Sequence, residues 1–129
     1  MSFADLELVP DNGAVDVAAV VTRLRSFPHA FVDPHDAQCW FLCATSDERE
    51  YCLAQRRADA TRRPYALLVL LDEQRVWLAG EFAKWDALRL ARQLVVWLVT
   101  QQHWKARDAA YSMTWNEDPL AFFADVPDP

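Results

Sequence analysis

Two histidines and two cysteines lie close together in the first third of the chain, and their types favour metal or thiol chemistry. They are His29, His35, Cys39 and Cys43. Two thiolates that share a zinc ion lie within roughly 4 Å of each other. On an extended strand, the Cα atoms of Cys39 and Cys43 would be roughly 13 Å apart, whereas a helix would bring them together. The apolar residues around them predict a strand, so we expect no metal ion and no cofactor.

A catalytic cysteine needs some exposure and a neighbouring imidazole, cation or helix N-terminus that stabilises the thiolate. The chain has three cysteines, Cys39, Cys43 and Cys52, and no C-x-x-C pair. Apolar and aromatic neighbours predict buried thiols in a reducing compartment, and we expect no catalytic residue. The alternative is a small thiol-dependent hydrolase or transferase in which the base is one of the imidazoles, His29, His35 or His103.

Composition argues against several classes of function. Phosphate-binding loops need several glycines, and this chain has only Gly13 and Gly80. A formal net charge of -6 disfavours nucleic acid, because binding to phosphate backbones depends on clustered Lys and Arg. The apolar run at 94–99 is much shorter than the roughly 20 residues of a membrane span. The first residues lack a basic signal-peptide region and include Asp5 and Glu7, so we expect a cytoplasmic protein without membrane contact.

The cationic residues are unevenly distributed. Eleven arginines against two lysines, together with the absence of isoleucine, suggest a bacterial protein from a GC-rich genome. Four of the arginines cluster in the middle of the chain: Arg56, Arg57, Arg62 and Arg63. This cluster has two interpretations, a site for phosphate or an acidic partner, or a solvated face whose Arg stems lie along the surface.

The first half of the chain predicts a strand, a helix and a second strand. Residues 3–9 alternate apolar and acidic side chains, which is typical of a half-solvated strand. Apolar residues at three- and four-residue spacing predict a helix over 14–26, which Pro28 ends. The following segment, through Asp33 and Pro34, is interpreted as a loop, and the apolar run 37–45 predicts a buried strand.

The middle of the chain predicts a helix followed by a hairpin. Thr45 and Glu48 form a capping-box pattern, which favours a helix over 46–60. The alternative for this segment is a returning strand. Two apolar runs around a polar turn predict a β-hairpin over 65–82. Its first strand is apolar on both faces, so we expect it to be central in the sheet and covered on both sides.

A broad apolar arc predicts that 83–104 is the main core helix, and an apolar C-terminal tail follows at 106–129. The chain has no internal repeat and no long polar linker. We therefore expect a single α+β domain over 1–129, with helices packed on a mixed or antiparallel sheet around the central hairpin. The tail would dock on this domain or on a partner.

Large aromatic residues supply the predicted partner-binding site. Four tryptophans fall on apolar faces and are expected in the core: Trp40, Trp77, Trp85 and Trp97. Trp104, in contrast, lies about 160° from Leu88 on the predicted helix, so it should be exposed unless something covers it. Exposed aromatic residues often mark partner sites. The predicted partner-binding residues are Trp104, Trp115, Phe122 and Phe123; alternatively, the tail that carries the last three folds back over Trp104.

These features favour a non-enzymatic cytosolic protein-binding domain. Its partner would be another protein, or a second copy of the chain in a homodimer. Immunity proteins and secretion chaperones are small acidic domains of this type, and acidic charge favours basic partners. A different alternative is a small-molecule-binding domain with a pocket between the sheet and the final helix.

Overall fold

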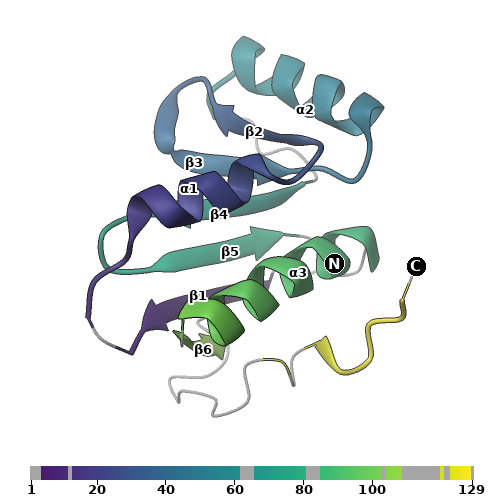
Figure 1. The fold of residues 1–129 in the computed structure, drawn as a ribbon. Helices are drawn as coiled ribbons and strands as arrows, with labels where there is room; N and C mark the ends of the chain where they lie inside the picture. Colours follow the sequence, from purple (N-terminus) through teal and green to yellow (C-terminus); the bar gives the residue numbers. More distant parts are fainter. Residues whose placement is uncertain are drawn as a thin grey trace.

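The computed structural model describes residues 4–11, 13–61, 66–80, 85–102, 104–108, 120 and 123–128. Within them the chain forms three helices and six strands (Figure 1). The elements of the first half are β1 (Ala4–Pro10), α1 (Val17–Arg25), β2 (Ala30–Asp33), β3 (Asp36–Leu42) and α2 (Ser46–Ala58). Those of the second half are β4 (Leu67–Leu71), β5 (Val76–Gly80), α3 (Trp85–Gln102) and β6 (Trp104–Asp108).

The strands form one sheet in the order β2-β3-β4-β5-β1-β6, and all neighbouring strands are antiparallel. The expected α+β fold is therefore confirmed, in its antiparallel form. The β4–β5 hairpin predicted over 65–82 is the central pair of strands. Asp72 stabilises its turn, because Oδ1 accepts hydrogen bonds from the backbone N–H groups of Gln74 and Arg75 at 2.7 and 3.0 Å.

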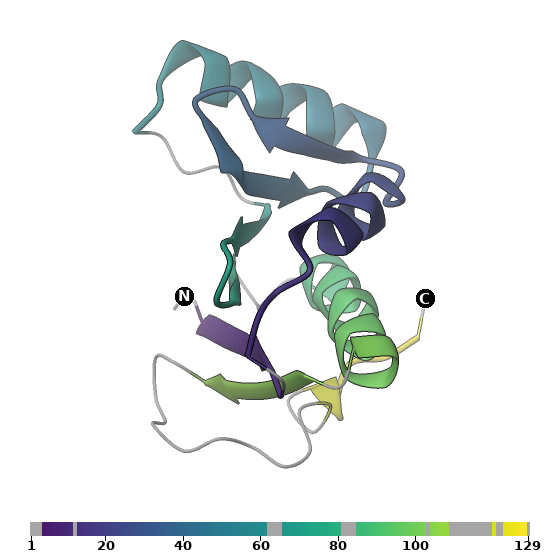
Figure 2. The same ribbon diagram turned by 60° about the vertical axis from the view of Figure 1, so that its left-hand side comes forward.

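The helices cover the two faces of the sheet unequally. Helices α1 and α3 lie together on one side of the sheet, and α2 lies beside the β2–β3 hairpin (Figure 2). The larger core lies under α1 and α3 and includes Leu8, Val69, Leu78 and Leu94, which are all fully buried. A second, smaller core packs under α2. Its members are Phe31, Cys39, Phe41, Cys43, Cys52, Leu53 and Ala66.

The predicted helix over 46–60 is confirmed as α2, and the returning strand is excluded. The Thr45 hydroxyl accepts a hydrogen bond from the Glu48 backbone N–H at 3.1 Å, as the capping box requires. The reciprocal bond is shifted by one residue, because the Glu48 carboxylate accepts from the Ala44 N–H at 3.3 Å. Helix α1 begins at Val17, three residues later than predicted, because Asp16 caps it and accepts from the Ala19 N–H at 3.1 Å.

Two strands were not predicted. The segment interpreted as a loop contains β2, whose residues pair with β3 in a tight hairpin that bulges at Val32 and Asp33. The predicted helix over 83–104 ends at Gln102, and Trp104 begins β6, where it pairs with Pro10 of β1. Both strands depend on pairing with distant residues, which local periodicity does not reveal. The helical-wheel argument for an exposed Trp104 is therefore wrong, since this residue is on a strand and is 5% exposed.

Three expectations about burial are also wrong. Trp77 was expected in the core, but it is only partly buried, beside Leu70 on the neighbouring strand. Trp85 was expected in the core, but it is the first residue of α3 and is 48% exposed. Strand β4 was expected to be covered on both faces; it is central in the sheet, yet Leu70 is 40% exposed. The side chains of Leu67 and Val69 point to the covered face and are fully buried. Being central in a sheet therefore does not guarantee cover on both faces.

In the described part of the chain, no helix combines the length and apolar character that crossing a membrane requires.

Candidate functional site

The cysteines that could do chemistry lie in the smaller core. The backbone around Cys39 is extended, as predicted, and all three cysteines are buried and form no disulfide. The Cys43 side chain is hydrogen-bonded to Cys52 of α2, a contact that the sequence analysis missed. This hydrogen bond and burial both raise the pKa of the Cys43 thiol above its ordinary value. The environment thus opposes formation of the thiolate that a nucleophile needs.

Two of the three candidate histidines, His29 and His35, lie in the described part of the chain. His35 Nε2 donates a hydrogen bond to the Arg56 carbonyl oxygen at 2.7 Å on the protein surface. The His29 carbonyl oxygen accepts from the Cys43 backbone N–H at 3.1 Å, and His103 lies outside the described residues. Within the described ranges, no group of three or more His, Cys, Asp or Glu residues is arranged to hold a metal ion.

Alkylation of the folded protein by iodoacetamide at neutral pH is expected to be at least about tenfold slower than alkylation in urea at the same pH. The reason is that the folded environment both covers Cys43 and raises its pKa, which lowers the thiolate fraction. Mass spectrometry after timed labelling measures the rate at each cysteine. Rapid labelling of any single thiol in the folded protein would contradict this prediction and favour the thiol-enzyme alternative.

Two members of the arginine cluster, Arg56 and Arg57, lie in the described part of the chain, and Arg56 is bound within the protein. The Arg56 Nε and Nη2 atoms donate to the two oxygens of Asp33 at 2.9 and 2.7 Å, and the guanidinium lies 5.5 Å from the centre of the Phe41 ring. This hydrogen bonding to Asp33 raises the pKa of Arg56 above its ordinary value. Arg57 is exposed, while the other two members, Arg62 and Arg63, lie outside the described residues. Arg56 therefore fastens α2 to β2 and is not available to bind phosphate.

Two of the four predicted partner-binding residues lie inside the protein. Trp104 and Phe123 belong to the same core cluster, and both are buried. Their positions favour the alternative in which the tail covers Trp104. Trp115 and Phe122 lie outside the described residues. The proposed partner-binding role of these aromatic residues stays a prediction.

The C-terminal tail is held against α3 by arginines. Arg89 Nε donates to the Pro127 carbonyl oxygen, and Arg92 Nη1 donates to the Val126 carbonyl oxygen, each at 2.9 Å. A further contact joins Arg92 to Asp128 at 3.1 Å. Because these bonds satisfy backbone carbonyl groups that follow Phe123, they fix the described tail in place over the larger core.

A different surface has the features of a binding site. We name it the open sheet face, and it is formed by side chains that point away from α1 and α3 on β4, β5 and β1. Its residues are Glu7, Leu70 and Trp77, together with Arg75, which immediately precedes β5. Cross-strand pairing places Trp77 between Leu70 on β4 and Glu7 on β1. Among the described residues, α2 covers this side of the sheet only over β2, β3 and the adjoining Leu68.

The electrostatics of the open sheet face centre on Arg75. Its guanidinium carbon lies 4.8 Å from the centre of the Trp77 ring, a cation–π distance. Its Nη1 atom lies 3.5 Å from Oε2 of Glu7, whose side chain is buried. Arg75 therefore covers part of the indole, and its positive charge is opposed by a carboxylate beneath it.

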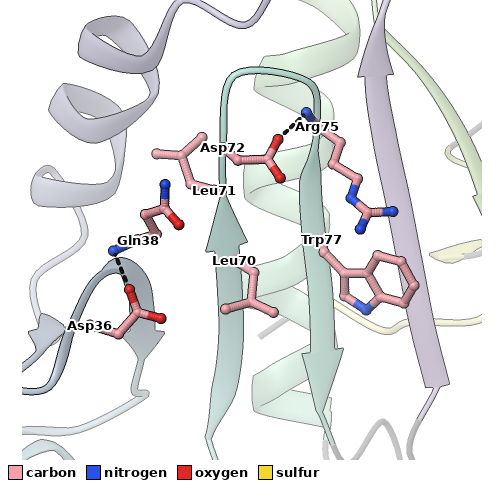
Figure 3. A pocket seen from close by; sticks show the side chains of 7 residues that line it. All are labelled: Asp36, Gln38, Leu70, Leu71, Asp72, Arg75 and Trp77. Carbon is pink, nitrogen blue, oxygen red and sulfur yellow. Dashed lines mark hydrogen bonds between the residues drawn. The ribbon is translucent and has the colours of Figure 1, made fainter.

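A cavity of about 160 Å³ adjoins this arrangement (Figure 3). It is lined by Asp36, Gln38, Leu70, Leu71, Asp72, Arg75 and Trp77. Leu70 and Trp77 lie side by side on the two hairpin strands, and the acidic residues lie toward the β4–β5 turn and β3. A second, more open hollow of about 310 Å³ adjoins it and is lined by Gln38, Asp72, Glu73 and Gln74.

The two aspartates of the cavity each use one oxygen to hold the local backbone. Asp36 Oδ1 accepts from the Gln38 N–H at 2.9 Å, and Asp72 Oδ1 accepts from two backbone N–H groups in the hairpin turn. Within the described part of the chain, the second oxygen of each carboxylate has no hydrogen-bond partner. The cavity thus combines an apolar wall with two fixed, partly available carboxylates.

The sequence carried a signal for this surface that was not recognised. The apolar run of β4 indicated a strand with two apolar faces, and in the structure the face that carries Leu70 is not covered by a described helix. No protein-family model, curated protein or solved structure matches this chain. Its function must therefore be argued from its own residues.

Proposed function

We propose that this chain is a non-enzymatic, cytosolic protein-binding domain whose partner packs on the open sheet face. The observation that carries the proposal is the exposure of Leu70, at 40%, in the central strand of the sheet. A leucine in that position gains stability from cover, since burying a leucine side chain contributes about 1.5–3 kcal/mol. Nothing in the described part of the chain provides that cover on this face.

The neighbours of Leu70 support binding to a protein. Trp77 is paired with it across the hairpin, and Arg75 lies over the indole. Trp and Arg are the residue types enriched at interface hot spots, which lie in the centre of a contact and exclude water. These features favour a protein partner over a drug-sized ligand.

More specifically, we propose that the chain is a bacterial immunity protein or secretion chaperone. Both act by occupying a partner's surface, and the net charge of -6 would attract basic partners. Buried cysteines that form no disulfide support a reducing compartment such as the cytosol. The thiol-dependent enzyme, the small-molecule-binding domain and the homodimer remain alternatives, and the buried Cys43–Cys52 pair gives the first of them no support.

Affinity capture with matched variants tests the proposal. The purified chain, immobilised at physiological salt, is expected to retain a protein from a lysate of its source organism, and Leu70→Gln is expected to lower that retention about tenfold or more. Val96→Gln is the control, because Val96 is similarly exposed, at 38%, but lies on α3. Circular dichroism confirms that both variants fold.

Two outcomes of this capture would contradict the proposal. If no protein is retained by the unmodified chain, the binding function is wrong. If Leu70→Gln and Val96→Gln retain the partner equally well, the partner does not use the open sheet face.

A further inference from the structure

We propose that the cavity on the open sheet face receives a lysine or arginine side chain from a basic partner protein. This inference rests on the function proposed above and specifies the chemistry of the partner. It follows from the charges around the cavity, from its apolar wall and from its size.

The charges at the cavity are mainly negative. Asp36 and Asp72 line it, and Glu73 lines the adjoining hollow. Among the described lining residues Arg75 is the one cation, and its charge is opposed by Glu7 at 3.5 Å. A phosphate or carboxylate group would meet several carboxylates at this point, whereas an ammonium or guanidinium group meets complementary charge.

The two carboxylates, Asp36 and Asp72, can each accept a hydrogen bond from a cation in the cavity. Oδ1 of Asp36 and Oδ1 of Asp72 are held by backbone N–H groups, which fixes the orientation of each side chain. The second oxygen of each remains available within the described part of the chain. Charge-assisted hydrogen bonds from a cation to such fixed acceptors are stronger than bonds between neutral groups.

The rest of the cavity suits the hydrocarbon stem of the same side chain. Leu70, Leu71 and Trp77 form its apolar wall. Lys and Arg side chains pack their methylene groups along apolar surface while the charged head reaches polar groups. The cavity itself, at about 160 Å³, is smaller than a site for a drug-sized molecule, and it adjoins the more open hollow of about 310 Å³.

A second copy of the chain is a poorer occupant than a basic partner. A two-fold contact through the open sheet face would bring the same surface of both copies together. Such a contact would bring two sets of the acidic residues Asp36, Asp72 and Glu73 into one interface, in a chain of net charge -6. Like charges across an interface disfavour association.

The test uses a synthetic peptide with arginine at its second and fourth positions and leucine at its first, third and fifth. In the matched peptide, citrulline replaces arginine, which removes the charge and nearly preserves the shape. Binding to the full chain is followed by two-dimensional ¹H–¹⁵N NMR. We expect saturable shifts at Gln38, Leu70 and the Trp77 indole N–H, and an affinity about tenfold or more higher for arginine than for citrulline.

Two double variants locate the binding. Asp36→Asn with Asp72→Asn removes two charges at the cavity, and asparagine keeps the Oδ1 acceptor that each turn uses. Asp47→Asn with Asp125→Asn removes the same charge at exposed positions elsewhere. The cavity variant is expected to lose about tenfold or more in affinity for the arginine peptide, and the control variant is expected to bind like the unmodified chain.

Several results would overturn the inference. Equal losses in both double variants, or shifts that leave Trp77 and Leu70 unchanged, would indicate binding through net charge alone. Sedimentation that shows self-association lost in Leu70→Gln would assign the face to a second copy. Absence of peptide binding, together with a captured protein that Leu70→Gln no longer retains, would overturn the inference and leave the proposed function supported. If the unmodified chain captures no protein, both the proposed function and this inference are contradicted.

Discussion

Replacement of Asp33 by alanine is expected to lower the free energy of unfolding by about 3–5 kcal/mol, because it leaves a largely buried guanidinium without its counter-ion. The Asp33 side chain is 1% exposed and that of Arg56 is 12% exposed. Two hydrogen bonds join them, at 2.9 and 2.7 Å, between β2 and α2. Urea unfolding monitored by circular dichroism measures the change.

An exposed ion pair of the same length provides the control. Arg49 and Glu50 are also 2.7 Å apart, but the Glu50 side chain is 67% exposed. Glu50→Ala is expected to change stability by less than about 1 kcal/mol, because water and salt screen exposed pairs. In the double variant Asp33→Leu, Arg56→Met, apolar packing replaces both charges, and much of the lost stability should return. Equal effects of Asp33→Ala and Glu50→Ala would show that burial does not govern this pair.

Replacement of Trp104 by alanine is expected to cost about 3–5 kcal/mol, the range for truncating a buried aromatic side chain. Trp104 is 5% exposed and shares the larger core with Phe123 and Val126. Its strand, β6, pairs with β1 at the edge of the sheet. Removing the indole therefore leaves a cavity where the tail, the edge strand and the core meet. Urea unfolding followed by circular dichroism reports the change without depending on tryptophan fluorescence.

Trp85 is the matched control for this substitution. It is 48% exposed at the start of α3, so Trp85→Ala is expected to lower the unfolding free energy by no more than about 1 kcal/mol. The comparison separates the two interpretations of Trp104. A stable Trp104→Ala variant that loses affinity for a captured partner would assign this residue to an interface, whereas a large loss of stability assigns it to the core.

The position of α2 explains why no described helix covers the open sheet face. The Asp33–Arg56 ion pair and the smaller core under α2 hold this helix over β2 and β3. Arg49 adds a hydrogen bond to the Ala30 carbonyl oxygen at 3.2 Å. Because these contacts all lie at one end of the sheet, the helix does not extend over Leu70 and Trp77. The contacts that hold α2 over β2 and β3 thus also leave the open sheet face without cover from this helix.

Features set by short-range interactions were predictable from the sequence. The Thr45 cap and the β4–β5 hairpin depend on residues close together in the chain, and the long core helix follows from its apolar period. The α+β class follows from the sum of these elements. Local hydrogen bonding and periodicity are written in the order of the residues, so a single sequence reveals them.

Features set by distant pairing were decided only by the tertiary structure. Strand β6 exists because it pairs with β1, at the opposite end of the chain, and this pairing converts Trp104 from a predicted surface residue into a core residue. The Asp33–Arg56 pair likewise joins residues 23 positions apart. The exposure of Leu70 depends on where α2 stops. The sequence alone thus determined which segments are apolar enough to need cover, and the tertiary structure decided which of them receive it, because cover comes from residues that are distant along the chain.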